Sequence, residues 1–97
     1  PASVRNLILV AYLKVLASRL RISSIIHRRD EMVMKFIQSA KLEPMILLQV
    51  LNEYRRFASL SATQPPYLTW KEKNVPAEKM MVHVQGMLEK IIQLQNQ

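Results

Sequence analysis

The sequence contains no cysteine and only one glycine. Without cysteine, disulfide scaffolds and thiolate chemistry are excluded, and nothing argues for secretion. There is no glycine-rich loop that would cradle phosphate groups, so the chain does not bind a nucleotide in that way. The single glycine, Gly86, is predicted to mark close helix packing rather than a binding role.

Side chains that perform catalysis are also scarce. The chain has one aspartate, Asp30, and two histidines, His27 and His83, whose sequence neighbours supply no triad. His27 and Asp30 are three positions apart and would share a metal only if another segment supplied a third ligand. Both histidines are expected at the surface. We therefore expect no catalytic residue, no metal site, no cofactor and no enzymatic activity in this chain.

No apolar run is long enough to cross a bilayer. The most apolar stretch, "LILVAYL" at 7–13, ends at Lys14, so we expect a buried helix and no membrane contact. Apolar residues make up 49% of the 97 residues, which is enough for one core and one domain over 1–97. The six methionines are expected to fill that core. The opening "PASVRN" has neither an initiator Met nor a signal-peptide pattern, so we expect a piece of a longer protein.

Positive charge is concentrated in the first part of the chain. The net charge is +7, and residues 1–41 contain eight Lys or Arg against two acids. A basic half is compatible with a nucleic-acid partner, an acidic protein partner or a solvated face. Arg19, Arg21, Arg28 and Arg29 lie close in sequence, but no aromatic residue is interleaved with them to stack on bases. We therefore expect at most weak, non-specific nucleic-acid binding.

Three segments have helical patterns: 3–20, 44–56 and about 76–95. Ser3 and Asn74 are predicted to cap the first and third of these helices. Apolar residues cover more than one face of the first helix, so it should be largely buried.

Two other stretches favour strands. Residues 22–38 fit either one helix or two β-rich runs, Ile22–Ile26 and Met32–Ile37, around the charged turn "HRRDE"; periodicity does not separate these. In 57–71, apolar and polar residues alternate on both sides of "QPP", which predicts a hairpin. A capping-box pattern, "TWKE", is a competing indication of a short helix at 69. A structureless loop of this length is uncommon in a compact domain, which favours the hairpin.

Longer patterns connect these elements. The stretch "PASVRNLILVAYLKVLASRLRISSI" contains a Pro, a Val-x-Asn-Leu helix entry, an "A-x-L-K-x-L-A" core and an "L-x-I-x-x-I" strand entry. "MKFIQSAKLEPMILLQVLNEY" and "EKMMVHVQGMLEKI" follow in a fixed order. Together they resemble the C-terminal domain of bacterial transcription-repair coupling factor (Mfd). Two positions depart from that family: Arg21 stands where a Gly usually follows the first helix, and "QPP" replaces an Asp/Gly-type turn.

The resemblance implies an α+β fold, α-ββ-α-ββ-α, with three helices packed on two short β-hairpins. The parent would be a cytoplasmic bacterial DNA translocase that removes stalled RNA polymerase and recruits UvrA. ATP and Mg would belong to its motor domains. This domain would pack on the parent's UvrB-like module and mask the UvrA-binding surface, so UvrA and RNA polymerase are indirect partners. Because the docking partner should carry complementary charge, exposed charges of the first helix, Arg5, Lys14 and Arg19, are the candidate interface residues.

Two other classes of function stay open. A basic nucleic-acid-binding module would show steep salt dependence. A free-standing protein-interaction module would show no affinity for a UvrB-like module.

Overall fold

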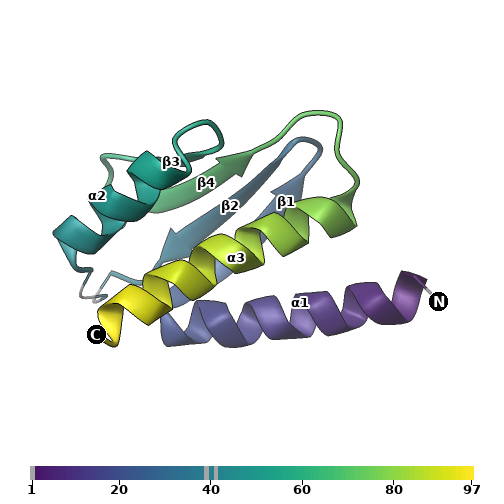
Figure 1. Cartoon of the computed structure of the whole chain (residues 1–97), viewed down its shortest axis with the longest axis horizontal. Coiled ribbons are helices and arrows are strands. Elements are labelled where there is room, and N and C mark those ends of the chain that lie inside the picture. Colours follow the sequence, from purple (N-terminus) through teal and green to yellow (C-terminus); the bar gives the residue numbers. More distant parts are fainter. Residues whose placement is uncertain (1, 39, 41) are drawn as a thin grey trace.

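Helices and strands alternate along the part of the chain that the structure describes, a computed structural model of residues 2–38, 40 and 42–97. The elements are α1 (Ala2–Arg19), β1 (Ile22–Arg28), β2 (Glu31–Phe36), α2 (Pro44–Glu53), β3 (Ala58–Leu60), β4 (Tyr67–Lys71) and α3 (Ala77–Gln95) (Figure 1). This order is the predicted α-ββ-α-ββ-α, and the α+β fold class is confirmed.

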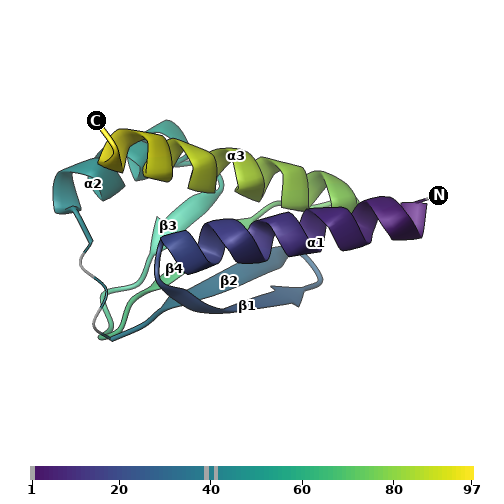
Figure 2. The same ribbon diagram turned by 90° about the horizontal axis from the view of Figure 1, so that it is seen from below.

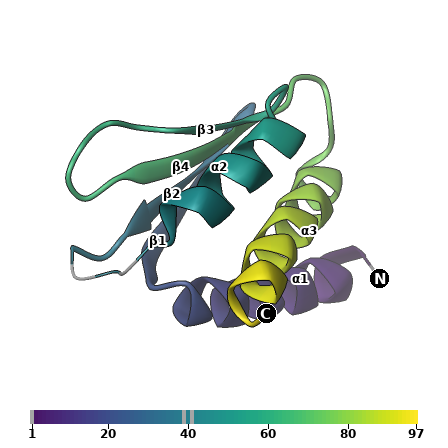
Figure 3. The ribbon, with the colours of Figure 1, turned by 60° about the vertical axis from the view of Figure 1, so that its left-hand side comes forward.

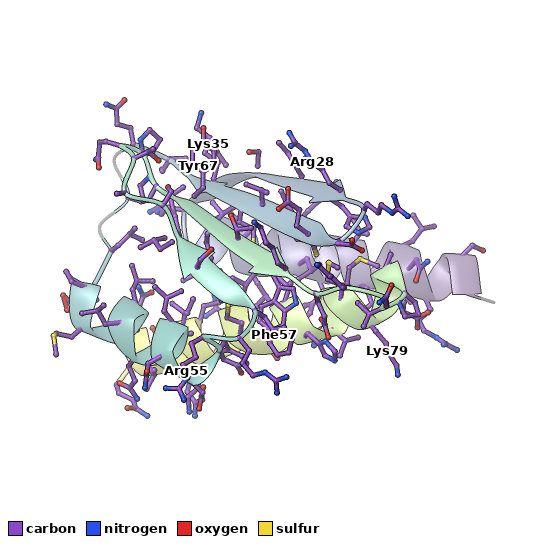
Figure 4. The ribbon with its side chains drawn as sticks, turned by 90° about the horizontal axis from the view of Figure 1, so that it is seen from above. Arg28, Lys35, Arg55, Phe57, Tyr67 and Lys79 are labelled. Carbon is purple, nitrogen blue, oxygen red and sulfur yellow. The ribbon has the colours of Figure 1, made fainter. Side chains whose placement is uncertain are left out.

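The four strands form one antiparallel sheet in the order β1-β2-β4-β3. The two predicted hairpins are therefore joined side by side through β2 and β4. Helices α1 and α3 pack against each other beneath the sheet, and α2 packs on α3 beside β3 (Figures 2 and 3). The opposite sheet face lies toward the viewer in Figure 4 without a helix over it; we refer to it as the open face.

The β1–β2 hairpin resolves the alternative left by the sequence. Residues 22–38 form two strands and not a helix, and the strands are joined by a two-residue turn, Arg29–Asp30. The turn is shorter than the predicted "HRRDE", because pairing continues through Arg28 and Glu31. Alternate side chains of β2 are buried, as expected for a strand with one face on the core.

The predicted hairpin in 57–71 is confirmed as well. Ala58 pairs with Trp70 and Leu60 pairs with Leu68, and the connection between the strands contains Pro65. Leu68 and Trp70 are buried while their neighbours in β4 are more exposed, which is the period-two pattern. No short helix begins at 69.

The core lies between the sheet and the helices. Its largest fully buried side chains are those of Trp70 and Phe36. Trp70 stacks on Phe57 at 5.1 Å between ring centroids and lies 5.7 Å from the Tyr54 ring. Five of the six methionines are buried in this core, as predicted: Met32, Met34, Met80, Met81 and Met87.

Several local predictions are wrong. Helix α1 begins at Ala2, so Ser3 lies in its first turn rather than at its cap. Asn74 does not cap α3: its φ of 61° is left-handed, and Pro76 occupies the cap position without a side-chain cap. A Cβ placed on Gly86 would meet nothing within 4 Å, so this glycine does not mark close packing. It borders a hollow beside Phe57 instead.

None of the helices in the described residues has the length and apolar character needed to cross a membrane.

Candidate interdomain docking site

Helix α1 has two apolar faces, and only one is covered. Leu13, Leu16 and Leu20 are buried against the rest of the domain. The prediction of a largely buried helix is wrong for the other side, where Leu7 is 71% exposed and Ile8 64%. Helix α1 packs on α3 and β1, and both lie on the same side of it, so its other side is left uncovered.

The exposed apolar residues form a continuous surface, which we call the outer stripe. It consists of Val4, Leu7, Ile8, Ala11 and Val15. Val4, Leu7, Ala11 and Val15 are three or four apart, and Ile8 follows Leu7, so all five lie along one side of a helix with 3.6 residues per turn. Contiguous apolar exposure of this kind typically marks an interaction site.

The three predicted interface charges do not form one cluster. By helical spacing, Arg5 and Arg19 lie on one side of the outer stripe and Lys14 lies on the other. The Arg5 guanidinium is in an ion pair with the Glu78 carboxylate of α3, at 3.1 Å between Nη1 and Oε1. No ion-pair partner for Lys14 or Arg19 is found within residues 2–38, 40 and 42–97. The outer stripe is thus flanked by positive charge on both sides.

Two exposed polar contacts join α1 to α3. Besides the Arg5–Glu78 pair, the Tyr12 hydroxyl donates a hydrogen bond to Glu89 at 2.7 Å. This hydrogen bond raises the pKa of Tyr12 above its ordinary value of 10.0, since the neutral phenol is the donor. The outer stripe is consequently presented on a helix fixed at two points along its length.

A second polar group lies at the end of β4. The Trp70 indole Nε1 donates to Glu72 Oε1 at 2.9 Å, and His83 Nδ1 lies 2.8 Å from the same oxygen. Burial is the largest single influence on the pKa of Glu72 and raises it. The hydrogen bonds from His83 and Trp70, with the positive charges of His83 and Lys79, together outweigh burial, so the pKa of Glu72 lies below its ordinary value. His83 is partly exposed, as predicted, but it belongs to this network.

The other histidine lies at the edge of the sheet. His27 is in β1 and Asp30 is in the following turn. Within the described ranges, no group of three His, Cys, Asp or Glu side chains comes close enough to hold a metal ion.

The four arginines that lie close in sequence are separated in space. Arg19 and Arg21 lie at the start of β1, whereas Arg28 and Arg29 lie at its end, roughly 20 Å away at strand geometry. Four cations and two acids line a hollow of about 290 Å³ at that end: Arg28, Arg29, Lys71, Lys73, Asp30 and Glu31. Proximity in sequence did not predict this cluster, because Lys71 and Lys73 are brought to the β1–β2 turn by the pairing of β2 with β4.

This geometry defines a small α+β domain whose exposed apolar helix face, and not a catalytic group, is the candidate site. A family model described as "TRCF domain" matches residues 1–47, which contain α1, β1, β2 and the start of α2. The match confirms the resemblance to transcription-repair coupling factor, and it supports a C-terminal, non-catalytic domain of such a DNA-repair factor. A search of curated proteins found no match.

Proposed function

We propose that this domain regulates a transcription-repair coupling factor by docking the outer stripe of α1 on the parent's UvrB-like module. In the docked state it masks the UvrA-binding surface, and a change of shape in the parent's motor releases it. The observation that supports this proposal is the outer stripe itself, an apolar surface on a helix within the residues that match the family.

The expected strength of the contact suits a reversible mask. Fully burying a Leu, Ile or Val side chain contributes about 1.5–3 kcal/mol, and part of this is lost to ordering costs. A tether to the partner provides an effective concentration in the millimolar range, so a weak contact suffices. Lys14 and Arg19, on opposite sides of the outer stripe, favour a partner groove that is apolar along its floor and acidic at its rims.

The test is the affinity of UvrA for the full-length parent with and without residues 1–97. A masking free energy of about 1–3 kcal/mol predicts that deletion raises UvrA affinity roughly 5- to 150-fold. The ATP hydrolysis rate of the parent serves as the control for an intact motor. Equal UvrA affinity in both proteins would reject the masking proposal.

Point substitutions in the full-length parent locate the docking surface. Leu7→Asp should reproduce much of the effect of the deletion, because it places a charge on the outer stripe. The matched control is Leu48→Asp, since Leu48 is 63% exposed on α2, away from the outer stripe. Charge reversals Lys14→Glu and Arg19→Glu should have smaller effects that weaken at high salt. If Leu48→Asp matches Leu7→Asp, the docking surface is not α1.

A further inference from the structure

Strand β1 is an edge strand with free backbone groups. It stands at the end of the sheet order, and in the described part of the chain no strand pairs with its outer side (Figure 2). The two-residue turn makes Arg28 and Glu31 a hydrogen-bonded pair, and in an antiparallel ladder such pairs alternate. Ile26 therefore also bonds to β2, and the N–H and C=O groups of Ile25 and His27 point outward.

A groove runs beside this edge, between β1 and α1. It consists of two hollows, of about 320 and 440 Å³, which share Lys14 and Ile25 in their linings. The first hollow is mainly apolar and reaches Val10 and Met32; the second lies toward Ser24. The inward side chains of β1 thus form one wall of the groove, and α1 forms the other.

The charged side chains around the groove are all basic, which favours an acidic ligand. No acid lines either hollow, and β1 itself contains none. Lys14 lies within the groove, and Arg28 is exposed on β1. Asn6 also lines the first hollow, and its Oδ1 atom is buried without a hydrogen-bond partner among the described residues.

We propose that the outer edge of β1 and this groove bind an extended, acidic segment of a partner protein by strand addition. The backbone of the segment pairs with Ile25 and His27, and alternate apolar side chains enter the groove. The intervening acidic side chains lie on the opposite side of the added strand, beside Arg28, so Arg28 and not Lys14 meets their charge. The groove adjoins the outer stripe at Lys14 but contains none of the stripe's own residues, and the proposal does not depend on the masking function.

An irregularity in β1 limits the length of peptide that can pair with its outer edge. The register shifts between Ile22 and Ser24, where Ser23 bonds to the Lys35 carbonyl through its side chain. Such a bulge interrupts regular pairing and protects an edge from unlimited association. Pairing is thus confined to the part of β1 from Ile25 onward, which suits a short segment and a reversible complex.

The experiment titrates the isotope-labelled 97-residue chain with a capped peptide of about eight residues in which Val and Glu alternate. Three control peptides have the same composition in block order, Lys in place of Glu, or N-methyl groups on alternate amides. We expect NMR shift changes at Ile25, His27 and Val10, with slower amide exchange at Ile25 and His27. Each control peptide should bind at least about tenfold more weakly.

A matched pair of variants tests the backbone contact. His27→Pro removes the outward N–H at a position where an edge strand accepts proline, and His27→Ala removes the side chain alone. We expect His27→Pro to weaken peptide binding about tenfold relative to His27→Ala, with the rest of the spectrum unchanged. Leu7→Gln, which makes the outer stripe less apolar without adding a charge beside the groove, should leave peptide affinity unchanged.

Several results would overturn strand addition. One is that the peptide causes no NMR shift changes up to millimolar concentration, or only changes away from β1 and α1. The others are that the N-methylated peptide binds as tightly as the unmodified one, or that His27→Pro binds the peptide as tightly as His27→Ala.

Discussion

At the scale of single residues, Glu72 has the most informative surroundings. Its carboxylate accepts hydrogen bonds near the buried Trp70 ring, and its side chain is only 11% exposed. Sequence patterns predicted the alternation that buries Trp70. They did not predict the contact with His83, because eleven residues and a turn separate the two.

The pH dependence of stability tests this network. Because the folded-state pKa of Glu72 lies below its ordinary value of 4.5, its contribution is fully present above that value and is lost as pH falls through the folded pKa. We expect Glu72→Gln to lower the free energy of unfolding by about 1 kcal/mol at neutral pH. The difference from the wild type should shrink under acid conditions.

Urea unfolding of both proteins across the acid range measures this difference. Glu53→Gln is the control, since Glu53 is exposed on α2. A difference between Glu72→Gln and the wild type that stays constant with pH would contradict the role of the charge.

At the scale of elements, the junction between α1 and β1 forces the backbone of Arg21 into a left-handed conformation. Arg21 has φ 61°, the left-handed conformation that costs an L-residue about 1–2 kcal/mol. The family resemblance places a Gly here, and the structure gives the reason. The Arg21 carbonyl also accepts a hydrogen bond from Ile37 at 2.8 Å, so this conformation is fixed by the sheet.

Replacing Arg21 with Gly should therefore stabilise the domain. We expect Arg21→Gly to raise the free energy of unfolding by about 1 kcal/mol, because Gly adopts positive φ without steric cost. Arg19→Gly, two residues earlier in α1, should lower it by about 1 kcal/mol. Thermal or urea unfolding of the two variants checks both signs; if Arg21→Gly is less stable than the wild type, the side chain of Arg21 stabilises the junction.

Element types were largely predictable from the sequence, and their surroundings were not. Period-two alternation located β3 and β4, and helical spacing located α2 and α3. The same spacing showed that α1 is apolar on two sides. It did not show that only one side would be covered, because that depends on where α3 and β1 pack.

At the scale of the whole molecule, the fold separates Arg19 and Arg21 from Arg28 and Arg29. The open face presents Arg28, Lys35 and Tyr67, with the Lys35 ammonium 5.8 Å from the centre of the Tyr67 ring (Figure 4). Arg19 and Arg21 lie at the other end of β1. No single surface therefore combines all the arginines that lie close in sequence.

This separation predicts weak nucleic-acid binding. We expect the 97-residue chain to bind DNA without sequence preference, with dissociation constants of roughly 10⁻⁴ to 10⁻⁶ M at physiological salt and a steep loss at higher salt. Reversing Arg28 and Arg29 to Glu should weaken it further, and reversing Lys90 of α3 is the control. Fluorescence anisotropy at several salt concentrations measures this. Sub-micromolar, sequence-selective binding would make nucleic-acid recognition the primary function.

Local periodicity and composition by themselves determined the three helices, the second hairpin and the absence of cysteine chemistry. They left residues 22–38 open between one helix and two strands. Only the tertiary structure decided which face of α1 stays exposed, which cations meet at the β1–β2 turn and that β1 stands at an edge of the sheet. Those properties depend on strand order and helix placement, which bring residues far apart in sequence into contact. The outer stripe and the groove beside β1 exist because helices α1 and α3 cover one face of a four-stranded sheet and leave its β1 edge unpaired.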